Sequence, residues 1–158
     1  MARLTDIESE KQALLSVLDS PPDIKYFILS ELRDEYFSFG DAAEVWQRIR
    51  AVLSMPGSHG LSDLPNAQVL AYDAALSDAA RFFISSGQCR VLTHDDANSI
   101  IVNLKHHSRL RAIHGGVSVL TEMLSGQATP EDLDVAEMAL EDALVTSRGF
   151  KERGYNLL

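Results

Sequence analysis

The sequence predicts an all-α protein, in which a compact bundle of short helices is followed by a long antiparallel helical hairpin. Apolar residues recur at helical spacing along most of the 158 residues, and proline, glycine and capping residues separate these stretches. Strand-like alternation is nearly absent, and residues 88–93 are the one short candidate. We therefore expect a globular subdomain at 1–93, the hairpin as a dimerisation element at 94–147, and the start of a linker at 148–158.

Capping and breaking residues set the first two helices. Thr5 and Glu8 form a capping box, in which a hydroxyl and a carboxylate three residues on bind free backbone amides. The helix that follows ends near Asp19, because Pro21 cannot continue it. Pro22 suits the first turn of a second helix.

Three more helices are expected before residue 90. Asp41 caps the third helix of the chain, and Glu44 completes its capping box. A loop at 55–60 is rich in proline and glycine. Two short helices follow, near 66–76 and 77–86.

The hairpin is predicted from one long helix at 95–125 and a last helix that ends near 147. Thr129 caps the last helix and Pro130 lies in its first turn. The connection at 126–128 is short, so the two helices must be antiparallel neighbours.

One set of apolar positions on each helix of the hairpin has the spacing of a coiled-coil seam. Each large side chain buried there contributes roughly 1.5–3 kcal/mol at most. This hairpin seam consists of Leu110, Ile113, Val117, Leu120 and Leu124 on the long helix, and of Leu133, Ala136, Leu140 and Ala143 on the last helix.

A second apolar stripe exceeds what two helices can bury between themselves. It must face the globular part, another copy of the chain or a different protein, and its position at the end of a domain favours self-association. Ala112 and Gly116 are small enough to let another helix approach closely. The second stripe consists of Ala112, Gly116, Val119 and Met123 on the long helix, and of Val135, Met138, Ala139 and Val145 on the last helix.

The two predicted helices of the hairpin differ in the sign of their charge. Residues 131–142 hold six acids and no base, whereas residues 103–121 hold Lys105, Arg109 and Arg111 and no acid. Each run suits a solvated face, or a pairing between neighbouring hairpins that fixes their orientation. The formal net charge of −9 disfavours a broad nucleic-acid grip and favours protein partners.

No catalytic, cofactor or metal site is predicted. The chain lacks a glycine-rich phosphate loop with lysine. His107 and His114 are seven residues apart, whereas metal ligands on helices usually lie three or four apart; a small helical enzyme using these histidines is the least favoured alternative. Cys89 is expected to be a buried structural thiol. The aromatic side chains Tyr26, Phe27, Tyr36, Phe37, Phe39 and Trp46 are expected in the core, because acids rather than bases surround them.

The N-terminus becomes polar too early for a signal peptide, and no apolar run approaches the ~20 residues that cross a bilayer. We therefore expect a cytoplasmic protein without membrane contact, as the single cysteine also indicates.

The order of several segments resembles a known family. An acid precedes an apolar pattern at 10–18, an acid–aromatic pair lies at 34–37, a helix is expected at 43–49, and a basic helix at 104–111 precedes the helix at 130–137. This order is similar to the N-terminal domain of DnaB-type replicative DNA helicases of bacteria and phages. Serine at position 16, where the family often has glycine, and a poor match over 61–91 indicate a divergent, phage-like member.

The resemblance implies a collar domain without ATPase or unwinding activity of its own. Such domains pair through their hairpins as dimers, form a trimer of dimers in the hexamer and bind primase. Single-stranded DNA passes through the ring of the full-length protein, and ATP and magnesium belong to a motor domain that would follow Leu158. The alternative is a free-standing helical adaptor or phage regulatory protein that binds another replication protein.

Overall fold

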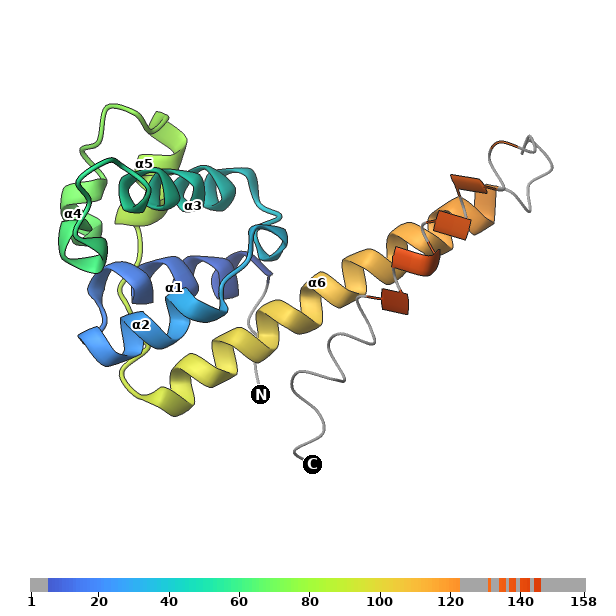
Figure 1. Ribbon diagram of the computed structural model, residues 1–158, viewed down its shortest axis with the longest axis horizontal. Coiled ribbons are helices and arrows are strands. Elements are labelled where there is room, and N and C mark those ends of the chain that lie inside the picture. The colour runs from blue at the N-terminus through green and yellow to red at the C-terminus, as the bar shows by residue number, and fades with distance from the viewer. Residues whose placement is uncertain are drawn as a thin grey trace. The chain divides into compact units, whose positions relative to one another are not determined.

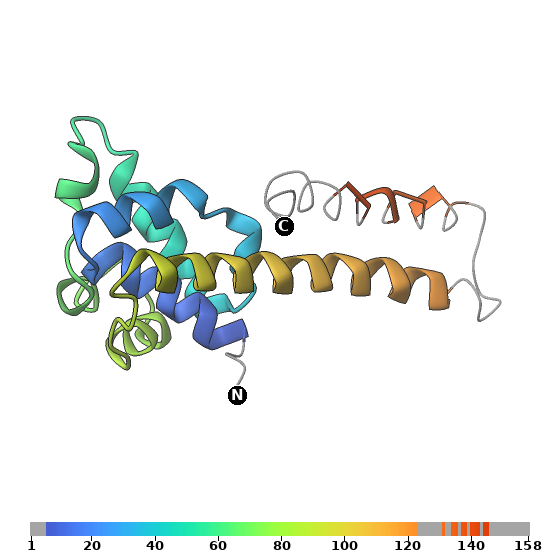
Figure 2. The ribbon, with the colours of Figure 1, turned by 90° about the horizontal axis from the view of Figure 1, so that it is seen from below.

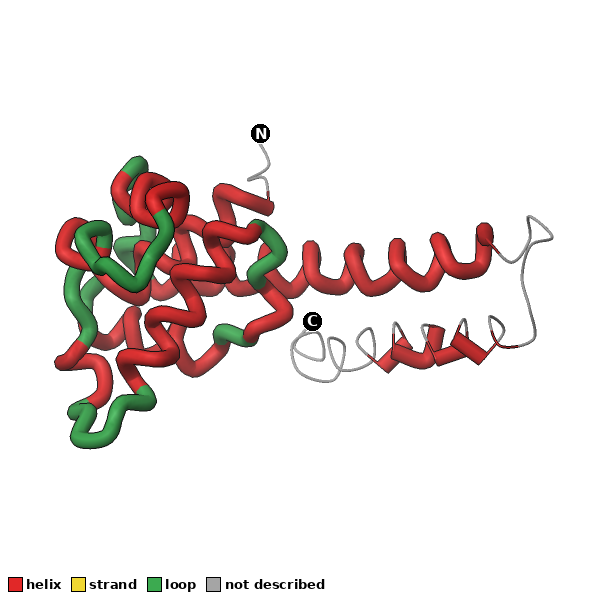
Figure 3. The backbone as a smooth tube through the Cα atoms, turned by 90° about the horizontal axis from the view of Figure 1, so that it is seen from above, coloured by secondary structure: helices red, strands yellow, loops and turns green. Residues whose placement is uncertain are grey.

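The computed structural model describes residues 6–122 and, within the last helical segment, residues 131, 134–135, 137–138, 140–142 and 144–145. All regular secondary structure in these residues is helical, as the tube in Figure 3 shows. The predicted all-helical class is therefore confirmed for this part of the chain. Residues 88–93, the strand candidate, contain no strand.

The elements follow one another in a simple order (Figure 1). The helix predicted to end near Asp19 does so, and Pro22 begins the second helix, as expected. The elements are α1 (Asp6–Asp19), α2 (Pro22–Glu31), the 3-10 helix η1 (Asp34–Tyr36), α3 (Gly40–Leu53), the 3-10 helix η2 (Gly60–Asp63), α4 (Ala67–Leu70), α5 (Asp78–Ser85) and α6 (His94–Glu122).

The chain forms two compact units, Met1–Leu104 and Lys105–Leu158. The boundary lies within the residues of α6 (Figure 2). Our sequence-based boundary lay earlier, between 93 and 94. The first turns of α6 belong to the first unit because Ala97, Ile100, Ile101 and Leu104 are buried in its core.

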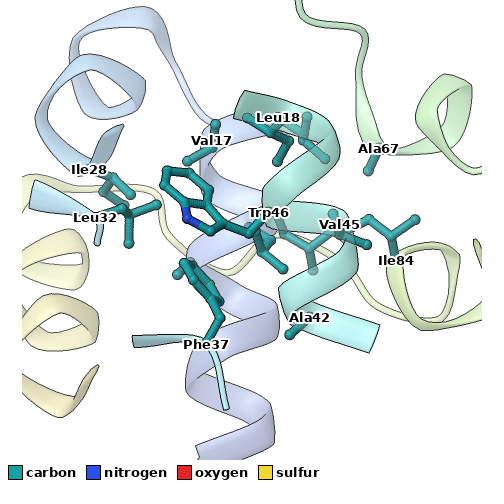
Figure 4. Close-up of a cluster of buried hydrophobic side chains, with 14 of the residues drawn as sticks. Val17, Leu18, Ile28, Leu32, Phe37, Ala42, Val45, Trp46, Ala67 and Ile84 are labelled. Carbon is teal, nitrogen blue, oxygen red and sulfur yellow. The ribbon is translucent and has the colours of Figure 1, made fainter. Parts of the chain in front are cut away.

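Helix α1 is the centre of the first unit. It packs against α2, α3, α4 and α5, and residues 9–18 are buried except for the half-buried Lys11. Leu14, Leu15 and Val17 have no exposed surface. Figure 4 shows Val17 of this helix beside Trp46, which also lies next to Phe37 and Leu32. A helix enclosed on all sides buries its polar residues as well, and these must find partners.

Glu10 of α1 supplies a cap for helix α3. Its Oε1 accepts a hydrogen bond from the backbone amide of Phe39 at 3.0 Å, and its Oε2 accepts one from the Ser38 hydroxyl at 3.0 Å. Phe39 is the residue before α3, and its own side chain makes no capping hydrogen bond. The predicted capping box of Asp41 and Glu44 is therefore wrong. The carboxylate that binds the backbone amide at the start of α3 comes from Glu10 on α1.

Glu44 instead ties α3 to the turn before α5. Its Oε2 accepts a hydrogen bond from the backbone amide of Ser77 at 2.6 Å, and the Ser77 hydroxyl accepts one from the amide of Ala80, which caps α5. Helix α4 is shorter than the predicted 66–76. It ends at Leu70, and turns lead from there to Ser77.

Asp34 joins the 3-10 turn η1 to helix α3. Its Oδ1 accepts a hydrogen bond from Trp46 Nε1 at 2.7 Å, and both of its oxygens lie within 2.7 Å of Arg50 Nη1. The Phe37 ring stacks on the Trp46 ring with 5.2 Å between centroids. The hydrogen bond from Trp46, followed by those from Arg50, lowers the pKa of Asp34 below its ordinary value.

Leu14→Ala should lower the free energy of unfolding by about 3 kcal/mol, because it removes methyl groups from a fully buried site and leaves a cavity. Urea unfolding followed by circular dichroism measures the change. Val69→Ala is the control, since Val69 is 57% exposed and should change stability by less than about 0.5 kcal/mol. Equal effects of the two variants would contradict the placement of α1 at the centre.

Asp34→Asn should lower the melting temperature at pH 7, because the charged carboxylate is favoured in the folded chain. A group with a depressed folded pKa contributes stability above its unfolded pKa and loses it as the pH falls through the folded pKa. The difference between the two proteins should therefore be largest at neutral pH and should shrink as the pH falls below the ordinary carboxyl range. Thermal melts across this range provide the measurement, and the exposed Asp78→Asn is the control.

Candidate interaction surface

The residues predicted for the hairpin seam and the second stripe all lie in the second unit. On α6, three members of the hairpin seam, Leu110, Ile113 and Val117, are exposed, and Leu120 is half-buried. Their spacing of three and four residues places the exposed three on one face of the helix. This face therefore presents a row of large apolar side chains to solvent in the single chain.

The covered face of α6 is the one assigned to the second stripe. Gly116 is buried, and Ala112 and Val119 are half-buried. On this helix the described residues of the second stripe are thus more covered than Leu110, Ile113 and Val117 of the seam. Spacing alone does not rank the two stripes, because both recur every three or four residues. Side-chain size separates them, because small residues permit a closer approach than large ones.

The described positions between 131 and 145 are helical and expose apolar side chains too. Leu140, a seam residue, is half-buried. Val135, Met138 and Val145 of the second stripe are exposed, Met138 by 65%. Leu144, which belonged to neither predicted set, is also exposed. The remaining predicted positions, Met123, Leu124, Leu133, Ala136, Ala139 and Ala143, lie outside the described residues, as does 148–158.

Charges accompany the apolar positions. The acids described between 131 and 145 are all exposed: Glu131, Asp134, Glu137, Glu141 and Asp142. The basic residues Lys105, Arg109 and Arg111 on α6 are half-buried. The surface of the second unit therefore combines exposed apolar side chains with charges of both signs.

No protein-family model, curated protein or solved structure matches this chain.

Two histidines of α6 lie in contact with each other, and a third lies near a serine. The rings of His106 and His107 meet edge to face with 5.7 Å between centroids. Nδ1 of the exposed His114 lies 3.5 Å from the Ser118 hydroxyl on the next turn. Within residues 6–122 and the described part of the last helix, no group of three or more histidine, cysteine or acidic side chains has the geometry of a metal site. None of the described helices is long and apolar enough to span a membrane.

The first unit has exposed apolar side chains that the sequence analysis missed. Val69 and Tyr72, in and just after α4, and Phe82 on α5 all face solvent. Tyr26 on α2 is exposed as well, which corrects its assignment to the core, whereas Tyr36, Phe37 and Trp46 are buried as predicted. The spacing of Tyr26 two residues after Ile24 indicates its outward direction, because Ile24 and Ile28 mark the buried side of α2.

Gly115→Ala should stabilise the chain by about 0.5–1 kcal/mol, because alanine favours the helix and an added Cβ at this position meets no atom within 4 Å. Thermal unfolding followed by circular dichroism measures the gain. Gly87→Ala is the contrasting variant, because an added Cβ there is crowded. It would lie 3.0 Å from Lys11 Cδ and 3.3 Å from Leu15 Cδ1, so a neighbouring side chain would have to shift. A loss of stability in Gly115→Ala would mean that another surface covers this position.

Proposed function

We propose that this chain is an assembly module, the N-terminal collar domain of a DnaB-type replicative helicase. In this proposal α6 and the last helical segment run antiparallel as a hairpin, and hairpins of neighbouring copies pack together as dimers. The dimers form a trimer of dimers, and the collar binds primase. ATP hydrolysis and unwinding belong to a separate motor domain of such helicases.

The row of exposed apolar side chains on α6 carries the proposal. Leu110, Ile113 and Val117 share one face, and the segment at 131–145 exposes Val135, Met138 and Val145. Apolar surface grouped in this way on a monomer marks a protein interaction site more often than a solvated face. Burying it against a second copy removes it from water and contributes favourably at about 25 cal/mol per Å².

Charge favours a second copy as the partner. The exposed acids at 131–142 and the basic residues at 105–111 give one chain both halves of a complementary pair. Such pairs fix the orientation of two partners more than they add affinity. A two-fold arrangement of hairpins would satisfy each pair twice, as in most homodimers.

Val117→Glu and Met138→Glu should each weaken self-association about tenfold or more, because each places a carboxylate in the apolar contact. Sedimentation equilibrium over a wide concentration range measures the dissociation constant. Val69→Glu is the matched control. Val69 is 57% exposed and Val117 is 52% exposed, but Val69 lies on the first unit and Val117 on the second. A chain that remains monomeric at every concentration would contradict the assembly module.

A free-standing adaptor that binds a different replication protein through the same surface is the second candidate. The exposed Tyr72 and Phe82 of the first unit favour it, because they offer a further apolar contact outside the second unit. The reading frame after the codon for Leu158 separates the two. A continuation into an ATPase with a phosphate-binding loop supports the collar, and a stop codon there supports the adaptor.

A further inference from the structure

The connector between α5 and α6, residues 86–93, passes the central helix without regular secondary structure. Its side chains alternate: Gln88, Arg90 and Leu92 are exposed, Cys89 is half-buried and Val91 is buried. This alternation is typical of an extended segment with one face on the core. Such a segment needs partners for its backbone polar groups, because within the described residues no strand lies beside it.

Gln12 of α1 supplies these partners. Its Nε2 donates a hydrogen bond to the carbonyl oxygen of Gln88 at 3.0 Å, and its Oε1 accepts one from the amide of Arg90 at 2.8 Å. The side chain is 4% exposed. The carboxamide thus presents one donor and one acceptor to alternate residues of the connector, as the peptide group of a neighbouring strand does.

The contacts at the two ends of the connector lie nearer to solvent. At the first end, Lys11 Nζ donates to the Ser86 hydroxyl at 3.1 Å. At the other end, Asp96 accepts from the amide of Thr93 and the Thr93 hydroxyl accepts from the amide of Asp96, which together form a capping box for α6. These exposed contacts are worth less than the buried pair at Gln12.

The next residue, His94, binds α2. Its Nε2 lies 3.2 Å from Asp23 Oδ2, and its ring meets the Phe27 ring edge to face at 5.8 Å. Both side chains of the polar pair are more than half exposed, so this contact is also weaker than the Gln12 pair.

We propose that Gln12 is a positioning residue that fixes the connector and, through it, the first turns of α6 on the first unit. Loss of its two hydrogen bonds opens the connector locally while the core around α1 remains folded. Its consequence for assembly rests on the proposed function, because α6 also carries the exposed row Leu110, Ile113 and Val117.

Gln12→Glu tests this role, because protonation of the new side chain restores what the substitution removes. A carboxylate has only acceptors, so it repels the Gln88 carbonyl and leaves one bond unmade. A neutral carboxylic acid again has one donor and one acceptor. Burial raises the pKa of such a group, so the neutral form should dominate by about pH 5.

Hydrogen exchange of the full chain, corrected for intrinsic rates, provides the measurement. At pH 7.5 the amides of 88–93 should exchange about tenfold faster or more in Gln12→Glu than in the unaltered protein at the same pH. Near pH 5 the difference should disappear. Gln12→Leu should show the faster exchange at both pH values. Val69→Ala, at a position on α4 that is 57% exposed, should show little change at either.

The proposal is overturned if the amides of 88–93 exchange at an unchanged rate in Gln12→Glu at pH 7.5. It is also overturned if their protection is lost at pH 7.5 and does not recover near pH 5. Should Gln12→Glu unfold the first unit at pH 7.5, Gln12→Met replaces it as a neutral side chain of similar length. A loss of protection confined to 88–93 in that variant supports the proposal, and unaltered protection overturns it.

Sedimentation of the same variants separates the two proposals. Weaker self-association of Gln12→Glu at pH 7.5, with recovery near pH 5 relative to the unaltered chain, supports the link between the connector and assembly. If the connector opens in Gln12→Glu while self-association is undiminished, that link is overturned. A monomeric unaltered chain overturns the proposed function instead, and the exchange data still decide the role of Gln12.

Discussion

Helix α1 is enclosed by α2, α3, α4 and α5, so each polar group on it must be satisfied inside the first unit. Glu10 binds the amide before α3, Gln12 binds the connector before α6, and Ser16 donates to the carbonyl of Ala13 at 2.7 Å. The buried Ser9 hydroxyl is an exception on this helix, because it has no hydrogen-bond partner among the residues that the structure describes. A single helix therefore lies at the centre of the apolar core and also holds two of the segments that lead into later helices.

Other carboxylates, including that of Asp19 at the end of α1, act in the same way. Asp19 accepts from the amide of Ala67 at 2.9 Å, Glu44 from that of Ser77, and Asp73 pairs with Arg48 at 2.7 Å. The net charge of −9 is thus not only a property of the surface. Several acids are structural, because they satisfy backbone amides where short helices begin, and short helices have proportionally more such amides than long ones.

Local signals in the sequence were enough to predict the all-helical class and the first helix boundaries. Pro21 and Pro22 mark the end of α1 and the start of α2, because proline acts on its own backbone. The start of α3 was not predictable in this way, since its capping carboxylate comes from Glu10, far away in the sequence. The start of α6, by contrast, has a local signal, because Thr93 and Asp96 form a capping box. The apolar positions of α6 form two stripes in the sequence, but their spacing does not show which stripe is more exposed, because both stripes have the same period.

Cys89, the only cysteine of the chain, lies within the connector that Gln12 holds. Burial raises the pKa of its thiol above the ordinary value, so the reactive thiolate is scarce while the connector is closed. The protein consequently contains its own chemical reporter. The rate at which an alkylating reagent modifies this sulfur should rise when the segment leaves α1, without a label having to be introduced.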